Sequence, residues 1–194
     1  MNTFVTEETE HGDLPVDVYH KLADDRILFL SDIIDDKIAT DIVATLLLKD
    51  AEDSESKITL FINSEGGDIR NILMIYDMMQ IVQAPIETVC IGSAMDESAI
   101  ILAAGTPGMR FATKNSMISI NQLTHDWVNY SDLTDAKIAL DQGLSDNKKM
   151  MDILSKCTGK TSKEVYGHFN RRMFFTANQA IKYGIIDKMV APNK

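Results

Sequence analysis

The sequence predicts an α/β fold with a mostly parallel sheet, and three observations predict it. Short apolar runs rich in β-branched and aromatic residues, such as RILFL (26–30) and KITLFIN (57–63), alternate with segments of helical spacing. The chain has 194 residues, of which 45% are hydrophobic and 25% charged, which suits one domain with a buried core. It contains neither an internal repeat nor a linker rich in proline and glycine.

Residues 1–17 are predicted to form a mobile segment, and residues 18–194 a single domain. The first fifteen residues, MNTFVTEETEHGDLP, are polar and acidic and lack the apolar stretch of a signal peptide. We therefore expect no secretory leader in this segment.

The first helix is expected over 35–53, because apolar residues recur there every three or four positions behind a capping Asp35 or Asp36. The run at 57–63 then predicts a second strand, and SEGGD (64–68) predicts a tight turn after it. Two adjacent glycines would leave backbone N–H groups free to bind an anion or an oxyanion, although a plain turn explains them equally well.

A second helix is predicted over 69–82, with one apolar face formed by Ile72, Ile75, Tyr76 and Met79. The run IETVCIG (86–92) predicts a buried strand, and a short apolar helix closed by Gly105 follows it. Asp96 stands at the start of that helix, where a carboxylate is a favourable N-cap. The alternative is that Asp96 is a regulatory or ligand-binding carboxylate.

The remaining predicted elements are two short strands within 109–121, a helix over 131–159, a helix capped by Thr161 and Glu164, a helix over 176–184 and a strand over 185–190. The helix over 131–159 would span about 40 Å at 1.5 Å per residue. Because no strand adjoins it, we expect it to project from the domain and to pack on another subunit.

Charge and composition exclude several classes of function. A net charge of −10 disfavours nucleic acid or an anionic membrane as the main partner. No apolar run approaches the roughly 18 residues of a membrane span. Cys90 and Cys157 are too few for a disulfide framework or a zinc site, and Cys90 is expected in the core. We expect a cytoplasmic protein with no metal and no cofactor.

Several motifs together resemble the ClpP family, the proteolytic subunits of the Clp protease. They are RILFL, LFINSEGGDI, CIG, ILAAGTPGMRFATKNS, NQL and MFFTANQAIKYGIIDK, in the family's order over Val18 to Val190. The resemblance implies a ClpP/crotonase-like ββα superhelix with a projecting long handle helix. It also implies seven-membered rings, stacked in pairs around a degradation chamber.

The resemblance further implies a Ser-His-Asp triad, and this chain has replaced every member of it. The family's serine falls at Asp96, its histidine at Asn121 and its aspartate at Arg172. A carboxylate cannot replace the serine nucleophile, an amide cannot shuttle a proton near pH 7, and a guanidinium cannot stabilise an imidazolium. The family's oxyanion hole uses the backbone N–H groups at Gly67 and Glu97, where Asp96 would repel an oxyanion or fill the hole itself.

The family also docks Clp ATPases in a hydrophobic groove on the outer face of the ring. The matching positions are Thr59, Phe61, Ile81, Val89, Ile91, Phe111, Thr113 and Val190. Because two of these positions carry threonine, the resemblance implies weakened docking. Closure of the core is the alternative explanation for these residues.

The contact between rings departs from the family as well. The family places an Arg-Asp dyad where this chain has Arg171 and Arg172, and QLTHDWVNYSD replaces the family's glycine-rich stretch. We predict that Arg172 pairs with Asp96, directly or through Asn121 or a water molecule. The alternative is that Arg172 turns outward beside Arg171 toward an acidic partner ring.

The residues therefore predict a catalytically inactive ClpP-like subunit. It would form a homo-heptamer or a hetero-oligomer with an active ClpP paralogue, and would serve structurally or regulatorily in a Clp-type protease assembly. Two alternatives stay open: a ClpP-type serine endopeptidase, and a crotonase-type enzyme that uses Asp96 as acid or base.

Overall fold

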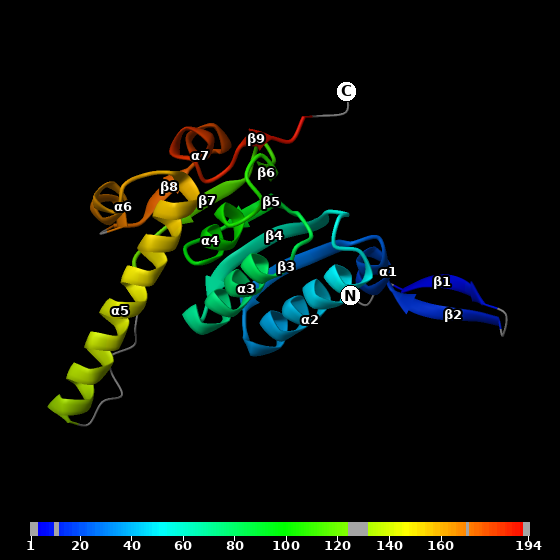
Figure 1. Ribbon diagram of the computed structural model, residues 1–194, viewed down its shortest axis with the longest axis horizontal. Helices are drawn as coiled ribbons and strands as arrows, with labels where there is room; N and C mark the ends of the chain where they lie inside the picture. Colours follow the sequence, from blue (N-terminus) through cyan, green and yellow to red (C-terminus); the bar gives the residue numbers. More distant parts are fainter. Residues whose placement is uncertain (1–3, 10–11, 124–131, 170, 192–194) are drawn as a thin grey trace.

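The computed structural model describes residues 4–9, 12–123, 132–169 and 171–191, and Figure 1 shows a layered body with an extension at each end. In chain order the elements are β1 (Phe4–Thr9), β2 (Gly12–Asp17), α1 (Val18–Asp24), β3 (Ile27–Ile34), α2 (Asp36–Glu52), β4 (Ile58–Gly67), α3 (Ile69–Ile81), β5 (Ile86–Ala94), α4 (Ser98–Ala103), β6 (Arg110–Ala112), β7 (Met117–Ile120), α5 (Leu133–Thr158), α6 (Ser162–Phe169), β8 (Met173–Phe175), α7 (Ala177–Tyr183) and β9 (Lys188–Met189). The predicted α/β fold with a parallel sheet and a long helix is confirmed.

The body is built on a seven-stranded sheet. Its main path runs β3-β4-β5-β6-β9 with every neighbouring pair parallel, and β7 adds a further parallel pairing to β5. Among the described strands of this sheet, only β8 runs antiparallel to its neighbour, β7. Successive right-handed crossovers between parallel strands place their helices on one face, and α2, α3 and α4 make these crossovers.

Alternation along β4 separates the two faces of the sheet. Ile58, Leu60 and Ile62 are fully buried, whereas Thr59 and Phe61 between them are partly exposed. The predicted apolar face of α3 is buried in the same core, at Ile72, Ile75, Tyr76 and Met79. The sheet therefore has one face covered by helices and one face that stays partly open.

Several predicted helix caps are confirmed. The carboxylate of Asp35 accepts a hydrogen bond from the Ile38 N–H at 2.8 Å and caps α2. Thr161 and Glu164 form the predicted capping box, because each side chain accepts a backbone N–H of the other residue. These local contacts explain why the starts of both helices could be read from the sequence.

The segment SEGGD does not form the predicted tight turn. After a bulge at Asp32 and Ile33, β4 continues to Gly67 and remains paired with the end of β3. Within this segment only Gly66 has a positive φ, of 100°. The glycines are required by close neighbours, because a Cβ at Gly67 would lie 2.3 Å from the carbonyl oxygen of Ile34.

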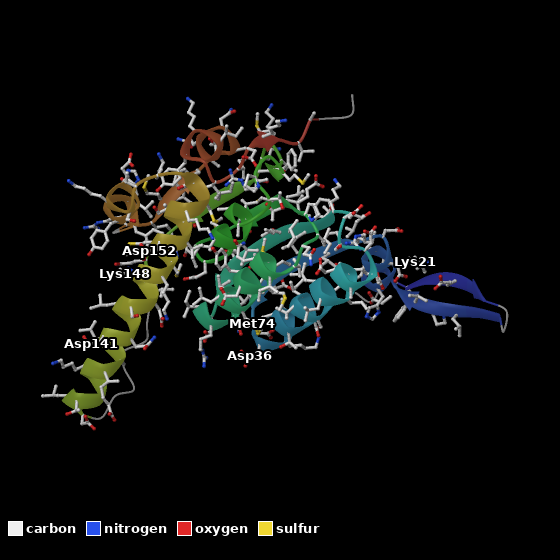
Figure 2. All side chains as sticks on the ribbon, viewed as in Figure 1. Lys21, Asp36, Met74, Asp141, Lys148 and Asp152 are labelled. Carbon is white, nitrogen blue, oxygen red and sulfur yellow. The ribbon has the colours of Figure 1, made fainter. Side chains whose placement is uncertain are left out.

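Helix α5 extends away from the body, as Figure 1 shows. Asp132 caps its start, and Gly159 ends it in the left-handed conformation. Its outer half exposes the large apolar side chains of Leu133, Ile138, Leu140 and Leu144. In Figure 2, Asp141, Lys148 and Asp152 follow one another along the same helix. Within the described residues, no helix has the length and apolar character needed to cross a membrane.

A hairpin of β1 and β2 extends from the opposite end of the body (Figure 1). The sequence alone predicted no regular element within 1–17, since its polar residues hide the cross-strand pairing, and it also missed α1. Lys21 lies at the base of the hairpin, where its ammonium group contacts the Glu7 carboxylate at 2.6 Å (Figure 2). The mobility of this segment stays a prediction.

Candidate functional site

The candidate site lies at the turn between β5 and α4. Asp96 has a φ of 50°, in the left-handed region that aspartate tolerates better than most residues. Helix α4 begins only at Ser98, and its N-cap is Glu97, whose side chain makes no capping hydrogen bond. The prediction that Asp96 caps this helix is therefore wrong, because the turn directs its carboxylate to other partners.

Those partners are a buried hydroxyl and a guanidinium. The Ser119 hydroxyl donates to Asp96 Oδ1 at 2.7 Å and accepts the Asp96 backbone N–H at 3.2 Å. Arg172 Nη2 donates to Asp96 Oδ2 at 2.5 Å. The ion pair between Arg172 and Asp96, predicted from the sequence, is confirmed. It joins the segment before β8 to the turn before α4.

Ser119 is a contact that the sequence analysis missed. It lies in β7 and is 1% exposed, while Asn121 follows the end of that strand. The sequence did contain a signal for this contact, which is the single hydroxyl side chain within the apolar strand MISI. A buried polar side chain needs a hydrogen-bond partner. At this turn β7 thus supplies the hydroxyl that fixes Asp96.

Replacing Arg172 with Met is expected to lower the free energy of unfolding by only about 0–1 kcal/mol. The Arg172 side chain is 51% exposed, so water screens its charge, and Ser119 still holds Asp96. Urea unfolding at low and high salt measures the effect, with Arg171→Met as the matched control. A loss of several kcal/mol specific to Arg172 would contradict this expectation.

Glu97 occupies the space beside the two glycines. Its Oε2 lies 2.4 Å from where a Cβ of Gly66 would stand, so a larger residue there would displace it, and the φ of 100° at Gly66 also favours glycine. The carboxyl group of Glu97 interacts with its own backbone N–H and with that of Gly67. The expectation that Asp96 could fill this position is corrected: Glu97 fills it, because Asp96 turns toward Ser119 and Arg172.

Burial raises the pKa of Glu97, and the Asp96 carboxylate raises it further. The two backbone N–H groups and Arg172 lower this pKa but do not offset burial. Folded protein therefore protonates Glu97 more readily than the unfolded chain does. At neutral pH the ionised Glu97 lowers the free energy of unfolding.

The substitution Glu97→Gln should make this effect visible as a function of pH. A raised folded-state pKa gives stability that is complete below the unfolded value near 4.5 and is lost as the pH rises through the folded value. Glutamine does not titrate, so the unfolding free energy of the variant minus that of the parent should grow between about pH 4 and pH 7. Urea unfolding across this range measures it. A difference that shrinks with pH would contradict the assignment.

The residues around this turn line a pocket of about 410 Å³. Its lining is Ile33, Glu65, Gly66, Gly67, Asp68, Ile69, Asp96, Glu97, Leu123 and Arg172. Four acidic residues and one arginine line this pocket, and no histidine among the described residues lines it. Ser98 and Ser119 are buried at 0% and 1% exposure, so neither hydroxyl is presented to a substrate.

Other titratable side chains lie outside this pocket. His168 Nδ1 is 3.2 Å from the Tyr183 hydroxyl, and burial raises the pKa of Tyr183 to about 12. Cys90 is fully buried, and burial raises its pKa to about 11. Over the ranges that the structure describes, no group of three or more His, Cys, Asp or Glu side chains is arranged to hold a metal ion.

Several positions matched to the ATPase-docking groove lie on the open face of the sheet. Phe61, Val89 and Phe111 are register partners on three adjacent strands. Phe29 continues this row, and its ring stacks on Phe61 at a centroid distance of 5.3 Å. Of these four residues only Val89 is buried, so closure of the core does not explain the others.

The remaining matched positions are also exposed or partly exposed. Ile81 and Val190 are 67% and 42% exposed. The Thr59 hydroxyl donates to the Glu87 carboxylate at 3.0 Å, so one threonine adds a polar contact to this face. The others are Ile91 and Thr113, both partly exposed.

Two predictions concern the contact between rings. Arg171 is exposed, whereas the neighbouring Arg172 is turned inward to Asp96. Most of the stretch QLTHDWVNYSD, with Trp127 and Tyr130, lies outside the described residues. Its predicted departure from the family therefore stays a prediction.

Comparison with known proteins gives the family. The Clp protease family model matches residues 10–193. The ATP-dependent Clp protease proteolytic subunit 3 of Frankia casuarinae is 38% identical over 190 residues, which cover 98% of this chain and 88% of the relative. Proteolytic subunit 2 of the same organism is 37% identical over 190 residues, with 98% and 87% covered. The chain therefore belongs to the Clp protease family, that of the proteolytic subunit ClpP.

Proposed function

We propose that this chain is a catalytically inactive ClpP-like subunit with the family's ββα superhelix, serving structurally or regulatorily in a cytoplasmic Clp-type protease assembly. One observation carries the proposal. At the position matched to the family's nucleophile stands Asp96, which is bound by Arg172 and Ser119. A carboxylate in an ion pair has no hydroxyl to activate, and the described lining of the pocket offers no imidazole to activate one.

Assembly is the second part of the proposal. Helix α5 exposes large apolar side chains along its outer half, at Leu133, Ile138, Leu140 and Leu144. Leu133, Leu140 and Leu144 fall on one side of the helix at about 100° per residue, and exposed large apolar side chains of this kind are typical of a protein contact. Both relatives are named as subunits of a protease. We therefore infer a ring, a homo-heptamer or a hetero-oligomer with an active ClpP paralogue.

Docking to a Clp ATPase is part of the same proposal. The open row formed by Phe29, Phe61 and Phe111 offers aromatic surface for an apolar segment of a partner. The hydrogen-bonded Thr59 makes the edge of this surface more polar. We therefore expect weak docking, with neither metal nor cofactor involved.

A second candidate follows from the names of the relatives, which denote proteolytic subunits. On that reading the chain would hydrolyse peptides. Peptide hydrolysis requires a nucleophile, and the described pocket does not present one, since Ser98 and Ser119 are buried. The two candidates give opposite results in one assay.

The assay combines labelling by a serine-reactive fluorophosphonate, turnover of a short fluorogenic peptide and native mass. The inactive subunit should show no stoichiometric adduct and no turnover, and its mass should correspond to a ring. An active ClpP serves as the positive control and as the mixing partner. Near-stoichiometric labelling of any serine would overturn inactivity, and a monomeric mass both alone and mixed would overturn assembly.

A further inference from the structure

Two backbone N–H groups act on one carboxyl group beside Asp96, that of Glu97. One belongs to Gly67 at the end of β4, and the other to Glu97 directly after the strained turn. Paired backbone donors beside a side chain on such a turn are suited to bind the negative charge that develops in acyl transfer. In this chain both donors already interact with the carboxyl group of Glu97.

The surrounding backbone is shaped to hold that carboxyl group. Gly66 has a φ of 100°, and any Cβ there would lie 2.4 Å from Glu97 Oε2 and 3.3 Å from the carbonyl oxygen of Met95. Glu97 is only partly exposed and lines the pocket together with Asp96 and Arg172. Its side chain therefore lies in the space that a substrate oxygen would need in order to reach the two N–H groups.

We propose that Glu97 is an internal plug of this anion-binding position, and hence a second block on peptide hydrolysis that acts independently of residues 96, 121 and 172. The inference rests on the proposed function and deepens it. Loss of one such donor typically lowers turnover by about 10²–10³-fold, and the plug occupies both donors. Restoring the three triad residues would then leave the site unable to stabilise an oxyanion.

The plug can be tested first in the otherwise unchanged protein. The amide resonance of Gly67, followed by NMR as the pH is varied, should shift with the ionisation of Glu97. The same resonance should not follow this titration in the Glu97→Gln variant, which keeps the shape but carries no ionisable group. Asp96 and Arg172, the charged groups that act on Glu97, are present in both proteins. A Gly67 amide that responds identically in the two proteins would overturn the proposal.

The second test restores the triad with Asp96→Ser, Asn121→His and Arg172→Asp, with and without Glu97→Ala. Each restored protein is mixed with a fluorophosphonate: the serine oxygen bonds to phosphorus, the imidazole takes its proton and fluoride leaves. The variant that also carries Glu97→Ala should be labelled at least about 10²-fold faster. Replacing Glu97→Ala by Glu97→Gln should keep labelling slow, because glutamine still fills the space.

Equal labelling rates with and without Glu97→Ala would overturn the plug. If neither restored protein is labelled, the Gly67 amide titration decides the question alone. These outcomes concern Glu97 only. The proposed function fails on a different result, labelling or turnover by the unmodified chain.

Discussion

Replacing Arg110 with Met is expected to lower the free energy of unfolding by about 3–5 kcal/mol, which is typical for removing one partner of a buried ion pair. Arg110 Nε and Nη2 bind both carboxylate oxygens of Asp187, at 3.0 and 2.6 Å. Its Nη1 also donates to the carbonyl oxygens of Ala103, Cys157 and Gly184. One guanidinium thus joins the ends of α4, α5 and α7, where carbonyl groups lack helical partners.

Asp187 shows why the loss should be large. Burial alone would raise the pKa of Asp187, but hydrogen bonds from the side chain and backbone of Arg110, with the Gly108 N–H, lower it. Without Arg110 the partly buried Asp187 carboxylate would keep its desolvation cost and lose its counter-charge. The methionine variant should therefore be destabilised most at neutral pH, where Asp187 is ionised.

Urea unfolding at fixed protein concentration measures this effect, and thermal unfolding should show a drop of roughly 6–20 °C. The matched control is Arg70→Met. Arg70 pairs with Asp68 at 2.7 Å, but its side chain is 82% exposed, so its loss should change stability by less than about 1 kcal/mol. Equal effects for Arg110 and Arg70 would show that the three helix ends do not depend on the buried guanidinium.

Most of the fold was predictable because its signals are local. Apolar patterning located β4 and α3, and side-chain caps at Asp35 and Thr161 marked where α2 and α6 begin. The elements that were missed lack such signals. The hairpin depends on cross-strand pairing between polar segments, and β8 has only three residues. Pairing across the chain cannot be read from a local pattern.

The site was predictable in its residues but not in its geometry. The pair between Asp96 and Arg172 followed from the family's layout, which places these positions together. The left-handed turn at Asp96 moved the start of α4 to Ser98 and gave the donors to Glu97 instead. Whether the carboxyl group of Asp96 or that of Glu97 reaches a backbone N–H depends on the φ angle of the turn. The φ angle of a non-glycine residue cannot be read from the sequence.

Replacing Gly67 with Ala should lower the free energy of unfolding by about 1–3 kcal/mol, the usual cost of forcing an extra carbon into a packed region. The new Cβ would lie 2.3 Å from the carbonyl oxygen and 2.9 Å from the backbone nitrogen of Ile34. These are backbone atoms of a paired strand, so the end of β3 must move away from β4.

The matched control for Gly67→Ala is Gly167→Ala. Gly167 lies within α6 with nothing within 4 Å of its Cβ position, so alanine there should raise the free energy of unfolding by about 0.5–1 kcal/mol. Changes of opposite sign in the free energy of unfolding for the two variants would show that Gly67 is required by its neighbour rather than by chain flexibility.

Moving Gly67 should also withdraw its N–H from Glu97. The pKa of Glu97 should then rise further, because the contact with this N–H lowers it. A Gly67→Ala protein as stable as Gly167→Ala would mean that β3 and β4 separate at no cost, and that the close contact does not hold the N–H in place.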